Sequence, residues 1–160
     1  MDEQIKGVLL AFILLLALIA SAQYYYQHVT QEPFPELGIL GPNQKIGDYP
    51  ASLLEGQNFT LYLYVGNHEG KVMFFNVLVK LGNSSSIINN STYLHANPIA
   101  SYQIVLLNNQ TWLNPITLSI NETGMNMKLV FELWDYNTTT QAFQYTGIWN
   151  QLYINVTGAA

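Results

Sequence analysis

The sequence predicts a mainly β protein, an immunoglobulin-like β-sandwich preceded by one N-terminal transmembrane helix. Three observations carry this prediction. One uninterrupted apolar segment lies near the N-terminus, several later runs alternate apolar and polar residues with a period of two, and no stretch after residue 35 has a convincing helical period. Setting the N-terminal segment aside leaves about 130 residues, which suit one domain with a sizeable core.

The apolar segment is long enough to cross a bilayer. Gly7 to Ala22 is almost entirely hydrocarbon, and with Ile5 and the tyrosines at 24–26 it gives 22 residues, about 33 Å of helix. Tyrosine rings favour the membrane interface, and Lys6 can reach the opposite one. We therefore expect a cytoplasmic tail at 1–6, a transmembrane helix in contact with lipid at 7–26, and a Pro-containing extended linker at 27–35.

Two other interpretations of this segment stay open. Ala20-Ser21-Ala22 has the pattern of a signal-peptide cleavage site, so the segment could be removed. Lys6-Gly7 before a long apolar run is similar to the processing site of archaeal type IV pilins, whose apolar helix packs into a filament. The two acids Asp2 and Glu3 argue against both, because export signals usually begin with net positive charge.

Eight N-glycosylation sequons follow the apolar segment and indicate an extracellular domain. Chance would give about two in a chain of this composition, so the excess needs an explanation. The acceptors, which we expect to carry N-linked glycans, are Asn58, Asn83, Asn89, Asn90, Asn109, Asn121, Asn137 and Asn155. The N-terminus is then cytoplasmic, and the chain crosses the cell membrane once.

The predicted sandwich occupies residues 36–157, with a short tail at 158–160. Period-two alternation assigns one set of side chains to the core and places Asn58, Asn121 and Asn155 on the outer face. About seven to nine strands with turns every 8–12 residues are typical of a sandwich. The expected inward sets are Phe59-Leu61-Leu63-Val65, Met73-Phe75-Val77-Val79, Tyr102-Ile104-Leu106, Ile116-Leu118-Ile120, Leu129-Phe131-Leu133 and Leu152-Ile154-Val156.

A structural turn is expected at Asn67, His68, Glu69 and Gly70. It joins two of the alternating runs and is typical of a hairpin connection in which Gly70 supplies a positive φ. His68 and Glu69 could ligate a metal, but no second histidine or carboxylate stands at ligand spacing. We expect His68 or Glu69 to bond the turn backbone and predict no metal, no cofactor and no catalytic residue.

Composition excludes several classes of function. The chain has no Cys, which removes disulfides, thiolate metal sites and cysteine nucleophiles. Its five basic residues are scattered lysines, so we expect no nucleic-acid partner. Glu122, Glu132 and Asp135 are interpreted as solvated strand ends or packing partners and not as a glycosidase pair. Six aromatic residues could form a sugar-binding face, although burial in the sandwich is favoured: Trp112, Trp134, Trp149, Tyr93, Tyr136 and Tyr145.

Two segments carry a family resemblance. The stretch 36–50 reads ELGILGPNQKIGDYP and is followed by Gly56, Tyr62-Leu-Tyr-Val and Asn67-His-Glu69. This pattern resembles the extracytoplasmic domain of archaeal domain-of-unknown-function family 1616. The end of the chain, from Tyr145 to Val156, is similar to that family's closing strand. The resemblance spans about residues 36–157. It implies an archaeal, surface-facing β-domain without known catalytic residues. Members often carry several membrane helices before the domain, whereas this chain shows one.

Together these observations predict a non-enzymatic, membrane-anchored archaeal surface glycoprotein. Its β-sandwich is expected to bind other envelope or membrane-complex proteins as an accessory subunit. The alternative is a pilus or filament subunit that self-assembles through the apolar helix or by strand exchange.

Overall fold

The apolar N-terminal run forms one helix, α1 (Glu3–His28), in a computed structural model that describes residues 2–28 and 32–158. The helix is longer than the predicted 7–26 at both ends. Asp2 accepts bonds from the amides of Ile5 and Lys6, and Glu3 pairs with Lys6 at 2.7 Å, so most of the expected tail is helical. An acid in the first turn also suits the helix dipole. By length and composition α1 can cross a membrane.

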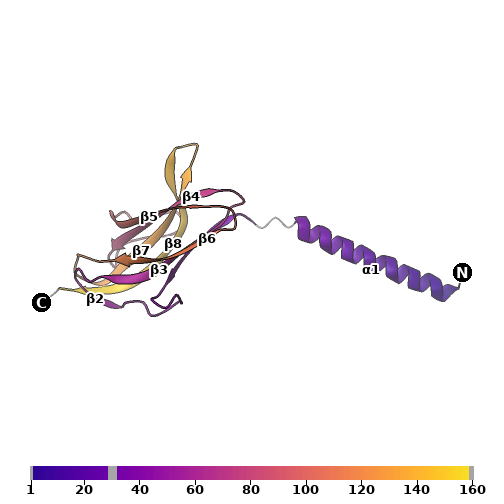
Figure 1. Cartoon of the computed structure of the whole chain (residues 1–160), viewed down its shortest axis with the longest axis horizontal. Coiled ribbons are helices and arrows are strands. Elements are labelled where there is room, and N and C mark those ends of the chain that lie inside the picture. The colour runs from indigo at the N-terminus through magenta and orange to yellow at the C-terminus, as the bar shows by residue number, and fades with distance from the viewer. Residues whose placement is uncertain (1, 29–31, 159–160) are drawn as a thin grey trace. The chain divides into compact units, whose positions relative to one another are not determined.

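The rest of the described chain is a β domain of two sheets (Figure 1). The smaller sheet has the order β1-β3-β6, and the larger one β2-β8-β7-β4-β5. All neighbours are antiparallel except β2 and β8, which pair in parallel. The strands are β1 (Phe34–Leu40), β2 (Ser52–Leu54), β3 (Phe59–His68), β4 (Met73–Gly82), β5 (Pro98–Leu106), β6 (Thr111–Leu118), β7 (Gly124–Asn137) and β8 (Ala142–Thr157).

This strand order confirms the immunoglobulin-like sandwich. β1, β3 and β6 take the places of strands A, B and E, while β8, β7, β4 and β5 take those of G, F, C and C′. β2 leaves the first sheet and pairs with the end of β8. The fold is thus specified without the Cys and Trp pattern of antibody domains, and packing alone must hold the sheets together.

The core lies between the two sheets and contains all the predicted inward sets, together with Ile39, Leu53 and Met127. Leu61, Leu63, Phe75, Phe131 and Leu133 are fully buried, and the remaining members are buried or half-buried against them. The polar residues between them point outward, as alternation requires. Removal of this apolar surface from water is the main stabilising contribution to the fold.

Three features of the strands differ from expectation. β1 starts at Phe34 and so takes up the end of the predicted linker; Pro35 is tolerated because β1 is an edge strand. β2 has only three residues, too few to show alternation. β7 and β8 are long, and their hairpin extends beyond the body of the domain, as the orange and yellow ribbon at the top of Figure 1 shows.

The predicted hairpin at Asn67–Gly70 is wrong. The strands on either side, β3 and β4, belong to different sheets and do not pair, so this segment crosses from one sheet to the other. Gly70 does adopt a positive φ, of 75°, as expected. The error arises because a hairpin and a crossing between sheets both require a tight reversal, and the turn residues are the same in the two cases.

Candidate functional site

A buried ion pair lies on the outer face of the larger sheet, away from the core. Val79 and Phe131 point inward, so alternation turns their neighbours Lys80 and Glu132 outward. The loop between β4 and β5, residues 83–97, covers them, and their side chains are 5% and 0% exposed. The Lys80 ammonium lies 2.9 Å from a Glu132 carboxylate oxygen. Such a pair is retained only where further hydrogen bonds satisfy both charges.

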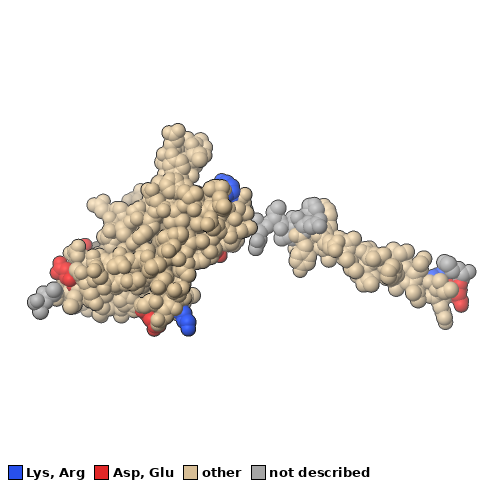
Figure 2. Space-filling view, viewed as in Figure 1, with Lys and Arg blue, Asp and Glu red and all other residues tan. Residues whose placement is uncertain are grey.

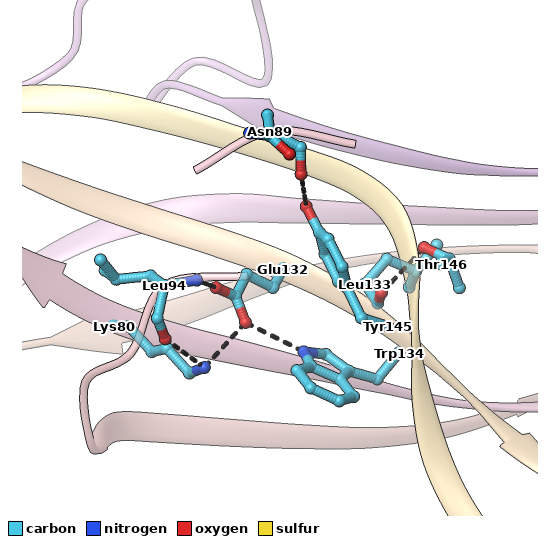
Figure 3. A network of polar contacts seen from close by, with 8 residues as sticks. All are labelled: Lys80, Asn89, Leu94, Glu132, Leu133, Trp134, Tyr145 and Thr146. Carbon is cyan, nitrogen blue, oxygen red and sulfur yellow. Dashed lines mark hydrogen bonds and ion pairs between the residues drawn. The ribbon is translucent and has the colours of Figure 1, made fainter. Parts of the chain in front are cut away.

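Those hydrogen bonds come from the covering loop and from β7 (Figure 3). The Leu94 amide donates to one Glu132 oxygen at 2.6 Å, and Trp134 Nε1 donates to the other at 3.0 Å. Lys80 donates to the Leu94 carbonyl at 2.8 Å. Both polar groups of one loop residue are therefore held by the two members of the pair. The arrangement fixes the loop to the sheet.

Aromatic rings enclose the ammonium. The rings of Tyr93 and Trp134 have centroids 4.9 and 5.5 Å from Lys80 Nζ, within cation–π range. Trp134 also contacts Tyr145, whose hydroxyl donates to the Asn89 carbonyl at 3.1 Å. Burial, and secondarily the negative charge of Glu132, raises the pKa of Tyr145 to about 12. This phenol stays protonated and serves as a donor to the loop.

The geometry supports a structural role in which the ion pair holds the covering loop to the sheet, with a shallow hollow beside it. A hollow of about 400 Å³ is lined by Lys80, Tyr93, His95 and Asn97, and His95 lies against Tyr93 with ring centroids 4.7 Å apart. Within the described residues no three His, Asp or Glu side chains gather as metal ligands would. Glu132 is committed to a cation and two donors, so it is not poised as a general base.

Sequence reasoning did not find this pair, although a signal was present. Lys80 and Glu132 each interrupt a run of apolar residues, flanked by Val79 and Leu81 in one case and by Phe131 and Leu133 in the other. Two opposite charges in such contexts suggest partners, since isolated buried charges are very costly. The sequence left two interpretations of Glu132 open, a solvated strand end or a packing partner, and its burial confirms the second.

The aromatic residues divide between the two faces of the sheets. Trp112 is half-buried and packs against the core, as predicted. Tyr93, Trp134 and Tyr145 lie on the outer face around Lys80 and not between the sheets, which corrects the expectation for these three. Tyr136 packs against Phe74 and Phe143 on the same outer side.

The predicted turn is held by the side chain of Asn67. This residue is fully buried, and its amide donates to the carbonyls of Lys71 and Leu106 at 2.8 and 2.9 Å while its oxygen accepts from the Glu69 amide at 3.0 Å. The Gly70 amide donates to an Asn108 side-chain oxygen. One amide side chain thus ties the crossing segment to the end of β5.

His68 makes side-chain contacts instead of bonds to the turn backbone. Its Nδ1 lies 3.2 Å from Asn109 Oδ1, its Nε2 lies 3.4 Å from Glu36 Oε2, and its ring stacks on Phe34 with centroids 4.9 Å apart. Tyr64 donates to the same Glu36 oxygen at 2.6 Å. That hydrogen bond, then burial and the negative charge of Glu36, raises the pKa of Tyr64 to about 12.

None of the eight sequon asparagines is buried. Six are exposed, and two, Asn137 and Asn155, are half-buried. Asn58 directly precedes β3 and Asn121 lies beyond the end of β6, so neither is within a strand, but both are exposed as predicted. Asn83, Asn89 and Asn90 all belong to the loop that the ion pair holds. Occupancy of the eight sites stays a prediction.

Comparison with solved structures finds matches of low similarity. The CARDB domain of the PF1109 protein from Pyrococcus furiosus, solved in complex with di-metal ions, is 12% identical with a TM-score of 0.46, covering 79% of this chain and 90% of that one. A β-glucosidase from Listeria innocua is also 12% identical, with a TM-score of 0.47, and the match covers 79% of this chain but 16% of the enzyme. At these scores the two-sheet assignment rests on the strand pairing alone.

A family assignment comes from sequence. No curated protein matches the chain. The family described as Domain of unknown function (DUF1616) matches residues 29–155, a span that contains all eight strands apart from the last residues of β8. The match agrees with the resemblance seen at 36–50 and 145–156, and the chain therefore belongs to the DUF1616 family.

Proposed function

We propose that this protein is a non-enzymatic, membrane-anchored archaeal surface glycoprotein whose β-sandwich binds envelope or membrane-complex proteins as an accessory subunit. The observation that carries the proposal is the distribution of the sequons. Eight acceptor sites fall on one domain after one apolar helix, and none of their asparagines is buried. A cytoplasmic domain has no use for such a pattern, because N-glycans are added on the exported side.

The character of the surface supports a binding role. Figure 2 shows few charged side chains on the visible face of the domain, which is covered mainly by uncharged residues. Only 9% of the chain is charged, while Asn, Gln, Ser and Thr supply most polar groups. Amides and hydroxyls do not titrate, so such a surface keeps its charge in an acidic exterior. The same surface can form hydrogen bonds with a partner without desolvating ions.

The non-enzymatic part of the proposal rests on the use of the titratable side chains. Glu132 is neutralised by Lys80, and Glu36 accepts hydrogen bonds from Tyr64 in a site shared with His68. Each of these groups already serves a structural contact. An enzyme would need a nucleophile or base with a free lone pair facing a cleft.

Extraction and mass spectrometry test the proposal on native material. Alkaline carbonate should leave the chain in the membrane pellet, and peptide mass spectrometry should find glycans at most sites, above all at Asn58 and Asn121. Asn89 and Asn90 are adjacent, so crowding should leave one of them bare in most molecules. Soluble protein beginning at Gln23, or bare asparagines throughout, would refute the proposal.

A filament subunit is the competing function, and one observation favours it. The described side chains of α1, at residues 3–26, are exposed, and a helix of this kind can be covered by lipid or by copies of itself. Processing distinguishes the two cases. A pilin-type subunit would lose its first six residues, so the intact mass of the native chain should match a start at Met1 if the anchor proposal is correct.

A further inference from the structure

The two sheets have four edge strands, and three of them are protected against pairing. β1 contains Pro35 and β6 contains Pro115, and each proline removes a backbone donor. β2 is three residues long. Prolines and short edge strands are the devices by which β proteins avoid edge-to-edge association.

The fourth edge, β5, has none of these devices over most of its length. It is nine residues long, contains no charged residue, and carries its only proline at the first position, Pro98. The register shift opposite Val79 and Lys80 disturbs only its start, leaving Ala100–Leu106 regularly paired with β4. Among the described residues, the Leu106 carbonyl is the one β5 backbone group in this stretch bonded outside the β4 ladder, to Asn67.

We propose that β5 pairs with β5 of a second copy of this chain, joining the two larger sheets into one continuous antiparallel sheet. Overlap of residues 101–105 with the same residues of the second copy leaves the Leu106 carbonyl to Asn67 and places Gln103 opposite Gln103 at the two-fold axis. Tyr102 then lies opposite Ile104, an aromatic and β-branched pair of the kind that stabilises antiparallel sheets. The two Gln103 side chains are exposed on the outer face and can bond to each other through their amides.

Two further observations fit a second copy as the occupant. The edge carries no charge, so two copies meet without repulsion. Val105, 62% exposed on the outer face, gains cover in the dimer. No sequon falls within β5, so glycans do not occupy the strand itself.

The symmetry sets this arrangement apart from a filament. A two-fold contact uses the same surface on both copies and is complete with two. The dimer is also independent of the proposed accessory role, because it requires no other protein. Its failure would leave that role intact, and failure of the accessory role would leave the dimer.

Lysine substitution in the full-length chain, purified in mild detergent, tests the pairing. Gln103→Lys places two like charges at the axis and should raise the dimer dissociation constant by up to about fivefold, as measured by sedimentation equilibrium. Gln103 makes no side-chain bond that folding needs among the described contacts. Ser52→Lys is the matched control, since it adds the same charge to an exposed residue at the other edge of the same sheet and should leave the dimer unchanged.

Cross-linking gives an independent measurement, because the chain has no cysteine. Gln103→Cys should form a covalent dimer on mild oxidation or with a short bis-maleimide, whereas Ser52→Cys should not. A wild-type chain that is monomeric at all accessible concentrations would overturn the proposal. A dimer that persists in Gln103→Lys and does not cross-link through Gln103→Cys would also overturn it, and would assign the association to α1. So would a monomer whose β5 pairs with an extended segment of another protein.

Discussion

Replacing Glu132 by Gln should strongly destabilise the β domain, although the two side chains are nearly identical in shape. The substitution leaves the Lys80 ammonium, 5% exposed, without its counter-ion. Removal of one partner from a buried pair costs about 3–5 kcal/mol. With roughly 3–6 °C per kcal/mol for a domain of this size, the melting temperature should fall by about 9–30 °C.

A double-mutant cycle separates the ion pair from its surroundings. Lys80→Met should also be strongly destabilising, because it leaves Glu132 charged and buried. The double variant should cost less than the sum of the two single changes, with a coupling energy of about 0.5–3 kcal/mol. It should not regain full stability, because the Leu94 carbonyl, which Lys80 binds, then lacks its partner.

Denaturant unfolding of the full-length chain, followed by tryptophan fluorescence, provides the free energies. Trp134 bonds Glu132 directly, so its emission reports on the site as well as on global unfolding. Limited proteolysis in the 83–97 loop should become faster in both single variants, since the pair fixes Leu94. If Glu132→Gln lowers the free energy of unfolding by less than about 1 kcal/mol, and the effects of the two single substitutions are additive, the pair behaves as a solvent-exposed ion pair. That result would refute the inference that the Lys80–Glu132 pair holds the 83–97 loop to the sheet.

Three other perturbations have defined outcomes. Asn67→Ala leaves two backbone carbonyls and one backbone amide without their side-chain partner. It should lower the free energy of unfolding, measured by denaturant titration, by about 2–4 kcal/mol. A change within about 0.5 kcal/mol would show that water replaces all three hydrogen bonds. His68→Ala removes one stacked ring and weak polar contacts, so it should lower the melting temperature by only about 3–6 °C. A chelator should not change the melting curve of the parent chain. A stoichiometric metal ion that is present in the parent chain and lost in His68→Ala would contradict both expectations. The pKa values of Tyr64 and Tyr145 are each about 12 in the folded state, against 10 in the unfolded state, so the folded state holds these two protons more tightly. Their contribution to stability is therefore complete below about pH 10 and is lost as the pH rises toward about 12. Ultraviolet titration should show phenolate absorbance that develops at high pH, and Tyr64→Phe and Tyr145→Phe should each reduce it.

Alternation predicted the core well because it is a local property of a strand. Leu61, Leu63 and Leu133 could be assigned inward from their neighbours alone, and all three are fully buried. β1 was missed because Pro35 and Gly38 interrupt the pattern and an edge strand tolerates both. β2 is too short to contain a period.

The sequence offered a signal for the Lys80–Glu132 pair but none for the loop that covers it, because that cover depends on contacts between distant parts of the chain. Leu94 and Glu132 are 38 positions apart, and nothing local shows that the loop folds back over the sheet. The same reason explains the error at Asn67–Gly70: turn residues specify a reversal, while the strand that pairs next is decided by tertiary packing. The exposure of the sequon asparagines could be predicted without knowledge of tertiary contacts.

The way the chain enters its domain has a mechanical consequence. β1 is the first strand of the domain, and the last residues of β8 pair with β2. The purple start of β1 and the yellow end of β8 lie at opposite ends of the sandwich in Figure 1. Tension applied between these two ends acts along β1, whose seven residues pair antiparallel with β3. The hydrogen bonds of such a ladder run perpendicular to the strands, so they are loaded together in shear and do not open one after another. An anchored domain pulled by a partner at its far end would resist through its first strand before its core is strained.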